Sequence, residues 1–412
     1  MNGAGAPAHA PLHAGAGAAS GSWPQQGGLW LLPDDDGGPD VETASAERPR
    51  AGKAAPDGVL QLLPIGTLPL EAGGELPGVV LGFETWGTLN ADGSNAVLVL
   101  HALTGSTHVS RGSSNDDGWW EPLVGPGRAI DTDEYFVVAP NIVGGCYGST
   151  GPASPAPDGR PWGSRFPLVS LRDSAVAEAR LADALGIRRW NTVVGGSMGG
   201  ARALEWAAMF PDRVERCICI AACAASTAEQ IAFAQAQLLA IRQDPHFAGG
   251  DYYDDDGPSA GLGLARRIAH ITYRCEPDLD SRFGRLPQGS EEPLRNGETP
   301  RGRYQVESYL DYQAGKLAGR FDANSYIAIT EALMSHDITR GRGSIADVFA
   351  GSDVEFVIAA VTSDRLYYPA QSEQLVSALP DGVEVRLELI DSPVGHDAFL
   401  IEAAQLSDII SR

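Results

Sequence analysis

The chain has 412 residues and is 43% hydrophobic, enough to bury a large core in one α/β domain with an insertion or in two domains. Its 30 basic and 53 acidic residues give a formal net charge of −23, and a field of that sign repels phosphate. Composition therefore argues against nucleic acid or an anionic membrane as a partner. An anionic substrate would need a local cluster of arginines.

Residues 1–55 are rich in Ala, Gly and Pro and show no apolar periodicity, which predicts a disordered extension outside the fold. The cysteine count is odd, at five, and the sequence has no secretory signal pattern, so we expect reduced thiols in a cytoplasmic protein. Cys217 and Cys219 alternate on a predicted strand and are expected in the core. We expect no metal site, because no second Cys or His pair stands at ligand spacing.

Short apolar strands then alternate with amphipathic helices. This alternation is typical of a mostly parallel, doubly wound sheet, and it predicts an α/β core over 56–225 and 345–412. The expected strands cover 59–84, 96–100, 135–140, 191–195, the residues around 218, 354–361 and 383–390, and the first expected helix follows Ser170 and ends at Gly186.

The alternation is interrupted over 226–344, where we find no buried strand pattern. The expected helices cover 227–242, 259–274, 305–317 and 324–335, with loops over 251–256 and 287–303. A helical insertion between sheet strands commonly covers a pocket at their carboxyl ends. The sequence therefore predicts a helical lid over 226–344.

The turn Gly195-Gly196-Ser197-Met198-Gly199 joins an apolar strand to a helix and fits the G-x-S-x-G pattern of a nucleophile elbow. The glycines are needed because a Cβ beside the strained serine would collide with the strand or the helix. The alternative is a glycine-rich turn that only packs a helix tightly on a sheet. The flanking strand and helix patterns favour a catalytic Ser197.

A serine nucleophile needs a base, and the base needs an orienting carboxylate. Asp364 and His396 each follow a predicted strand, in the chain order Ser, Asp, His of α/β hydrolases. We therefore predict Ser197, Asp364 and His396 as a triad. The weaker candidates for the base are the other histidines, above all His101, His270 and His336.

The backbone N–H of Met198 is the first expected oxyanion donor, and the loop after the 96–100 strand should supply the second, from Leu103 or Thr104. Asp397 follows the predicted base directly. It could cap the helix that follows, or it could meet a substrate ammonium if His396 faces a pocket.

Several motifs together resemble the homoserine O-acetyltransferase family, an α/β-hydrolase-fold family of methionine biosynthesis. The resemblance runs from about residue 60 to the C-terminus. The residues that carry it are His101 to Gly105, Gly118 to Trp120, Gly144 to Pro152, Gly195 to Gly200, Ala265-Arg266, Thr272-Tyr273, Ser363 to Tyr367 and Gly395 to Asp397.

The resemblance implies a ping-pong reaction in which Ser197 takes an acetyl group from acetyl-CoA and passes it to L-homoserine. Acetyl-CoA is then a substrate, and no permanently bound cofactor is expected. His396 and Asp364 would complete the triad, and Leu103 and Met198 the oxyanion site. The substrate-binding residues it implies are Arg266, with Arg267 as the alternative, Tyr273 and Asp397, to which we add Thr104.

Three questions stay open at this level. Relatives that transfer succinyl or use serine as acceptor differ by one or two pocket residues, and a plain esterase or thioesterase would share the whole triad. Coenzyme A has no phosphate loop here, so arginines must flank its channel; the candidates are Arg301, Arg303, Arg340 and Arg342. The resemblance also implies a homodimer that pairs through the helical lid.

Overall fold

We describe residues 55–295 and 301–412 of a computed structural model of the chain. The predicted extension over 1–55 lies outside these residues, except for its last residue. No helix of the described part is long and apolar enough to cross a membrane.

The described residues form one eight-stranded sheet in the order β1-β2-β6-β3-β7-β8-β9-β10. Strands β6 to β10 of this order run parallel, whereas β1 and β2 pair antiparallel at one edge. The predicted mostly parallel sheet is therefore confirmed. Its strands are β1 (Gln61–Pro69), β2 (Glu75–Trp86), β3 (Ala96–Leu100), β6 (Phe136–Pro140), β7 (Trp190–Gly196), β8 (Val214–Ile220), β9 (Glu355–Val361) and β10 (Val385–Ile390).

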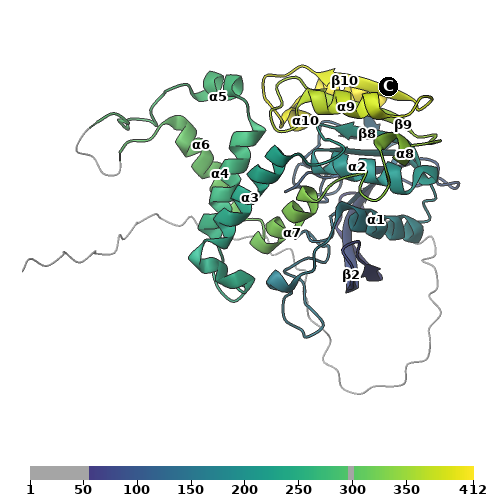
Figure 1. Ribbon diagram of the computed structural model, residues 1–412, viewed down its shortest axis with the longest axis horizontal. Helices are drawn as coiled ribbons and strands as arrows, with labels where there is room; N and C mark the ends of the chain where they lie inside the picture. The colour runs from purple at the N-terminus through teal and green to yellow at the C-terminus, as the bar shows by residue number, and fades with distance from the viewer. Residues whose placement is uncertain (1–54, 296–300) are drawn as a thin grey trace, which may run out of the picture. The chain divides into compact units, whose positions relative to one another are not determined.

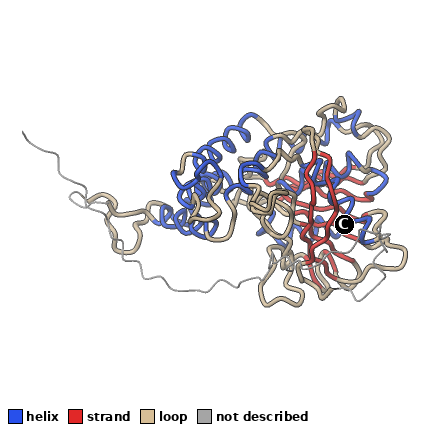
Figure 2. Tube along the Cα trace, turned by 90° about the horizontal axis from the view of Figure 1, so that it is seen from below, coloured by secondary structure: helices blue, strands red, loops and turns tan. Residues whose placement is uncertain are grey.

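Every residue of β3 and β6 is buried, because helices cover both faces of the sheet. Alternate residues of one strand enter different apolar clusters: Leu98 packs with the helices α1 (Leu171–Leu185) and α2 (Met198–Met209), and Val99 packs with α11 (Ala403–Ser411). This period of two follows from the pleat of a strand. Figure 2 shows the strands grouped together with helices flanking them.

Local signals fix the ends of α1. The Ser170 hydroxyl accepts from the Asp173 N–H and the Asp173 carboxylate accepts from the Ser170 N–H, which is a capping box, and Gly186 ends the helix with φ 78°. The predicted start after Ser170 and end at Gly186 are confirmed. Cys217 and Cys219 are fully buried, as predicted.

Helices lie between β8 and β9, as the sequence predicts, and α3, α4, α6 and α7 begin and end within a residue or so of their predicted bounds (Figure 1). The prediction missed two helices. One is α5, a short, mostly exposed helix that reads as polar loop, and the other is a single turn, α8. The helices are α3 (Ala228–Arg242), α4 (Ser259–Tyr273), α5 (Glu276–Phe283), α6 (Gln305–Ala318), α7 (Ala323–Met334) and α8 (Ile345–Val348).

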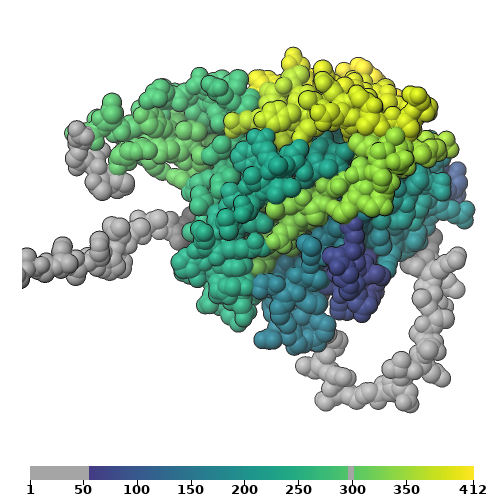
Figure 3. All heavy atoms as spheres, in the orientation of Figure 1, coloured from purple at the N-terminus to yellow at the C-terminus, as the bar shows by residue number. Residues whose placement is uncertain are grey.

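Smaller elements complete the described residues. They are a two-stranded sheet of β4 (Val124–Gly125) and β5 (Ile130–Asp131), the helices α9 (Pro369–Ala378) and α10 (Ala398–Ile401), and the 3₁₀ turns Gly163–Arg165, Pro211–Arg213 and Pro245–Gly250. Figure 3 shows the C-terminal segment, in yellow, lying against the green helical segment that follows β8. The residues that follow β3, β7 and β9 line one cavity together with residues of the inserted helices, so the carboxyl ends of these strands lie close to the insertion.

Candidate active site

Ser197 sits between the end of β7 and the start of α2 with φ 58° and ψ −126°. A positive φ at a residue with a Cβ costs on the order of 1–3 kcal/mol, so the surroundings must hold it. They do so on both sides: the Ser197 N–H donates to the Ile220 carbonyl at 2.9 Å, and its carbonyl accepts from the Ala201 N–H at 3.1 Å. The strained turn raises the hydroxyl above the sheet.

The glycines around Ser197 have no room for a side chain. A Cβ on Gly195 would lie 2.4 Å from the Gly199 carbonyl carbon, and one on Gly196 would lie 2.3 Å from the Phe399 ring. A Cβ on Gly199 would lie 2.0 Å from the Leu100 oxygen, in the neighbouring strand. These distances give the physical reason for the glycine pattern that the sequence presents.

The structure brings the three predicted triad side chains together. His396 Nε2 lies 2.8 Å from Ser197 Oγ, and His396 Nδ1 lies 2.6 Å from Asp364 Oδ2. The other oxygen of Asp364 accepts from the Leu366 N–H at 2.8 Å and the Tyr367 N–H at 2.9 Å. The carboxylate is thus fixed, and it orients the imidazole toward the hydroxyl.

The imidazole of His396 is enclosed by aromatic rings. Tyr367 stacks on it with centroids 5.0 Å apart, and Phe399 meets it edge-on at 5.4 Å. This burial by itself lowers the pKa of His396, but the charge of Asp364 and its hydrogen bond outweigh burial, so the pKa lies above the ordinary value. The pair favours the imidazolium that forms when Ser197 gives up its proton.

Two backbone N–H groups flank Ser197 at places suited to an oxyanion. Met198 is the first residue of α2, so its N–H has no intrahelical acceptor. Leu103 lies in the loop after β3 and lines the same cavity as Ser197. In the described part of the chain, the Leu103 N–H makes no hydrogen bond to another backbone group.

The competing histidines have other partners. His101 is buried and accepts from the Ile142 N–H at 3.1 Å; burial and then the Arg202 charge lower its pKa to about 3. His336 lies 3.0 Å from the Cys223 carbonyl, and His270 lies 3.2 Å from the Tyr309 hydroxyl. Among the described histidines, His396 is the one that contacts the Ser197 hydroxyl.

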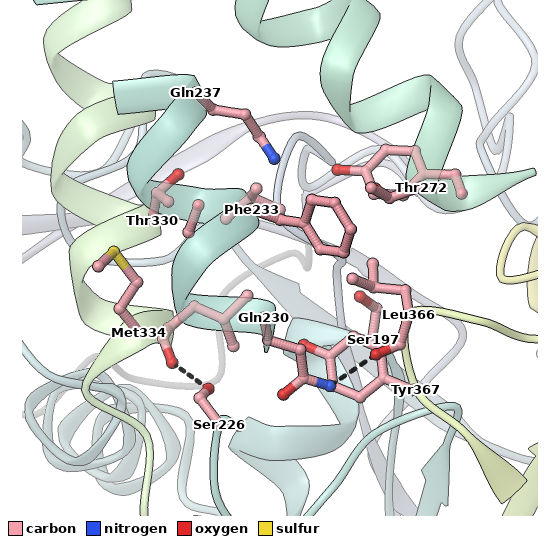
Figure 4. A pocket seen from close by; sticks show the side chains of 14 residues that line it. Ser197, Ser226, Gln230, Phe233, Gln237, Thr272, Thr330, Met334, Leu366 and Tyr367 are labelled. Atoms are coloured by element: carbon pink, nitrogen blue, oxygen red, sulfur yellow. Dashed lines mark hydrogen bonds between the residues drawn. The ribbon is translucent and has the colours of Figure 1, made fainter. Parts of the chain in front are cut away.

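A cavity of about 60 Å³ lies over Ser197, between the carboxyl ends of the central strands and the inserted helices (Figure 4). None of the described residues that line it is charged. Gln230 is fixed there by donating to the Leu366 carbonyl at 2.7 Å, and Gln237 accepts from the Tyr326 hydroxyl. The lining consists of Leu103, Ser197, Ser226, Gln230, Phe233, Ala234, Gln237, Thr272, Tyr273, Thr330, Leu333, Met334, Leu366 and Tyr367.

The structure separates the two candidate arginines of α4. Arg267 points away to Asp311 on α6, at 2.7 Å. Arg266 instead points to the loop after β3, where its Nη1 lies 3.4 Å from Thr104 Oγ1, and its guanidinium lies 5.7 Å from the Tyr273 ring centroid. The buried Nε of Arg266 has no hydrogen-bond partner among the described residues. The guanidinium of Arg266 is thus the one available to a ligand anion.

Asp397 lies beside the imidazole of His396 but is already part of an ion pair. Its Oδ2 is 3.3 Å from Nε of Arg274, the residue that ends α4. Burial raises the pKa of Asp397, and the Arg274 charge acts in the opposite direction. Sequence reasoning did not identify Arg274, because no local pattern pairs residues 123 positions apart.

The four arginines suggested for coenzyme A are all ion-paired: Arg301 with Glu307, Arg303 with Glu291, Arg340 with Glu71 and Arg342 with Glu205. Arg320, which the sequence analysis did not single out, donates to the Thr104 carbonyl at 3.1 Å and to the Tyr147 hydroxyl at 2.6 Å. Within residues 55–295 and 301–412 it has no carboxylate partner. It fixes the loop that carries Leu103.

Comparison with known proteins gives a consistent result. A family model described as the alpha/beta hydrolase fold matches residues 95–403. A homoserine O-acetyltransferase from Thermobifida fusca is 56% identical over 350 residues, 84% of this chain and 90% of that protein.

Two solved structures are also similar. The crystal structure of homoserine O-acetyltransferase from Bacillus anthracis is 27% identical, with a TM-score of 0.80 over 86% of this chain and 98% of that one. An acetylester hydrolase from Corynebacterium glutamicum is 26% identical, with a TM-score of 0.73 over 86% of this chain and 95% of that one. The predicted α/β-hydrolase fold and the resemblance found in the sequence are confirmed. The chain belongs to the homoserine O-acetyltransferase family.

Proposed function

We propose that this chain transfers an acetyl group from acetyl-CoA to the hydroxyl of L-homoserine, a step of methionine biosynthesis. The observation that carries the proposal is the hydrogen-bonded relay of Ser197, His396 and Asp364 beneath an uncharged cavity, in a chain of this family. Acetyl-CoA is a substrate in this scheme, and the chain's own side chains supply the chemistry.

In the first half-reaction, Ser197 Oγ attacks the thioester carbonyl of acetyl-CoA while His396 Nε2 takes its proton. The N–H groups of Met198 and Leu103 receive the developing oxyanion, and each such donor is worth about 3 kcal/mol of barrier. The C–S bond then breaks, the imidazolium protonates the thiolate, and coenzyme A leaves. The acetyl group remains as an ester on Ser197.

In the second half-reaction, the hydroxyl oxygen of homoserine attacks the ester carbonyl while His396 takes the hydroxyl proton. The same two N–H groups receive the second oxyanion, and the proton returns to Ser197 Oγ when the ester bond breaks. Asp364 accepts from His396 Nδ1 throughout and stabilises each imidazolium. The products are O-acetylhomoserine and free enzyme.

The acceptor site follows from charge. A homoserine carboxylate needs a cation and can take the Arg266 guanidinium, whose Nε has no partner, with Thr104 and Tyr273 beside it. The ammonium group needs an anion, and Asp397, which follows His396 in the chain and interacts with its charge, can supply one. We infer from these residues that the acceptor binds on the Arg266 side of the imidazole.

The lining of the cavity supports acetyl as the transferred group. An acyl chain on Ser197 would project into this cavity, since Ser197 lines it. A succinyl chain would bring its free carboxylate into a lining without a charged residue, and an unpaired buried charge costs several kcal/mol. The small, uncharged acetyl group carries no such penalty.

We include a homodimer in the proposal. Large apolar side chains stay exposed on three helices of the insertion, although α3 and α4 line the cavity with their other faces and α6 packs against α4. They are Ile231 and Leu239 on α3, Leu264 and Ile271 on α4, and Tyr312 on α6. A second copy of the chain would cover this surface. Sedimentation measurements would give the mass of the protein in solution and so test the dimer.

The test is a matrix of two donors and two acceptors: acetyl-CoA and succinyl-CoA against L-homoserine and L-serine. We expect the highest kcat/KM for acetyl-CoA with homoserine, by at least about tenfold over each other pair. A preference for succinyl-CoA would contradict the assignment of the donor. Equal rates of thiol release with and without an acceptor would identify a thioesterase.

A further inference from the structure

Arg274 stands between two carboxylates at the end of α4. Its Nε lies 3.3 Å from Asp397 Oδ2, beside the triad, and its Nη1 lies 3.5 Å from Asp278 Oδ2 on α5. Both members of the pair are largely buried, with 13% of the Arg274 side chain and 15% of the Asp397 side chain exposed. Arg282 also reaches Asp278 Oδ2, at 3.5 Å, but does not contact Asp397.

The segments that carry the pair are fixed against each other. Gly395, with φ 90°, lies so close to the end of α4 that a Cβ would be 2.7 Å from the Tyr273 carbonyl oxygen and 3.0 Å from the Cys275 nitrogen. Cys275 Sγ also lies 2.6 Å from the Pro393 carbonyl oxygen. The loop that bears His396 and Asp397 is therefore held directly against Tyr273 and Cys275, the two neighbours of Arg274.

We propose that Arg274 is a positioning residue of the acceptor site, which holds the Asp397 carboxylate through Oδ2 so that Oδ1 can bind the ammonium group of the acceptor. The proposal rests on the proposed function and deepens it. In the described part of the chain, neither carboxylate oxygen of Asp397 accepts a hydrogen bond, and Oδ2 is the oxygen that forms the ion pair with Arg274 Nε, at 3.3 Å. The Arg274 guanidinium thus orients the carboxylate, and the ammonium group of the acceptor is the second cation that the carboxylate binds.

Arg274 also favours the charged form of the Asp397 carboxylate, although burial leaves the pKa of Asp397 above its ordinary value. Burial disfavours that form and raises the pKa of Asp397. The charges of Arg274, His396 and Arg266 lower it again, and Asp364 opposes them. Arg274 is the only one of the three cations that forms an ion pair with Asp397 in the described residues. Loss of Arg274 should therefore raise the pH at which Asp397 becomes protonated. A protonated Asp397 has no charge with which to bind the ammonium group.

The opposite role is physically possible and predicts the opposite sign. If Arg274 only neutralised Asp397, it would compete with the substrate ammonium, and its removal would tighten acceptor binding. If Arg274 only stabilised the fold, its removal would affect every ligand of the site equally. The choice of ligands can separate these cases.

The experiment compares Arg274→Gln and Arg274→Lys with Arg282→Gln, a matched control that removes a partner of Asp278 without touching Asp397. Each variant is assayed with L-homoserine as acceptor and with 4-hydroxybutanoate, which lacks the amino group, as a competitor. For Arg274→Gln we expect at least a tenfold rise in the homoserine KM at pH 7. We also expect the acidic limb of kcat/KM to move to higher pH.

The inhibition constant of 4-hydroxybutanoate should change less than twofold, and Arg274→Lys should restore most of the homoserine affinity. The rate at which acetyl-CoA acetylates Ser197, measured by mass spectrometry, should stay within twofold of the unchanged protein in every variant. This measurement also shows that the variants fold. A lower homoserine KM, or equal losses for both ligands, would overturn the proposal. Failure of the unchanged protein to become acetylated would instead contradict the proposed function.

Discussion

The site has two walls that are built differently. The sheet side presents Ser197, Asp364 and His396 from turns after three strands, and backbone contacts fix them: a positive φ at Ser197, two N–H groups on Asp364, and glycines without space for a Cβ. The helical side presents side chains from α3, α4 and α7, and none of these residues has a positive φ. We therefore expect the first wall to tolerate fewer substitutions than the second.

This difference separates chemistry from selection. Similar structures include both a homoserine O-acetyltransferase and an acetylester hydrolase, so the fold with its elbow is compatible with either outcome. In the proposed scheme, the charged groups that distinguish an amino-acid acceptor from water include Arg266 on α4 and Arg274, the residue that follows α4. The inserted helices should therefore select the acceptor, while the triad at the carboxyl ends of the strands performs acyl transfer.

The largest effect should come from the sheet wall. We expect Ser197→Ala to reduce transfer by at least about 10⁴-fold, because it removes the nucleophile on which both half-reactions depend. Steady-state kinetics with acetyl-CoA and homoserine measures the loss, and circular dichroism should show an unchanged fold. Transfer within tenfold of the unchanged protein would contradict the role of Ser197.

Two glycine substitutions compare the sheet wall with α6, a helix of the insertion outside the cavity lining. Gly199→Ala should destabilise the protein by about 3 kcal/mol or more, because its Cβ would lie 2.0 Å from the Leu100 oxygen. The control is Gly315→Ala in the middle of α6, where nothing lies within 4 Å of the added Cβ and up to about 1 kcal/mol of stabilisation is expected. Urea unfolding measures both. Equal effects would contradict the close packing assigned to the sheet wall.

The two neighbouring arginines of α4 test selection. Arg266→Ala should raise the homoserine KM about 10–100-fold, the value of lost charge-assisted hydrogen bonds, and leave acetylation of Ser197 in place. Arg267→Ala should change it less than about threefold, because that side chain pairs with Asp311 near the surface. A larger effect at Arg267 would reverse the assignment.

The pH dependence reports on His396. The imidazole must be neutral to act as a base, and its pKa is raised by Asp364, so activity should fall as pH decreases through a value above the ordinary ~6.5. The rate of Ser197 acetylation between pH 5 and 9 measures this limb. A limb clearly below pH 6 would contradict the electrostatic role of Asp364.

The smallest effect should come from an ion pair near the loop that carries Leu103. His108 Nδ1 lies 2.8 Å from buried Glu84, whose hydrogen bond and charge raise the pKa of His108 to about 9 despite burial. The pair should stabilise the fold fully below about pH 6.5, the unfolded value, and lose that contribution as pH rises through 9.

Replacement by glutamine, His108→Gln, should therefore cost about 1–2 kcal/mol at pH 6 and little above pH 10. Urea unfolding of both proteins across this range measures the difference. A constant difference at all pH values would assign the loss to packing instead of charge.

The sequence predicted what local patterns determine. Ser170 and Gly186 bound α1, and the order of Ser197, Asp364 and His396 after strands leads to the relay. The structure adds what depends on distant partners. Nothing near Arg274 or Arg320 in sequence indicates Asp397 or Thr104, and the ion pairs that engage Arg301 and Arg340 cannot be found from composition.

In this scheme, acetyl-CoA acetylates Ser197 at the carboxyl ends of the strands, and the inserted helices direct the acetyl group to homoserine. The most direct measurement is the fate of the acetyl group in one reaction: O-acetylhomoserine against free acetate, quantified from labelled acetyl-CoA. We predict that O-acetylhomoserine accounts for most of the coenzyme A released and that acetate forms slowly without homoserine. Acetate formed at the same rate with and without homoserine would contradict the account.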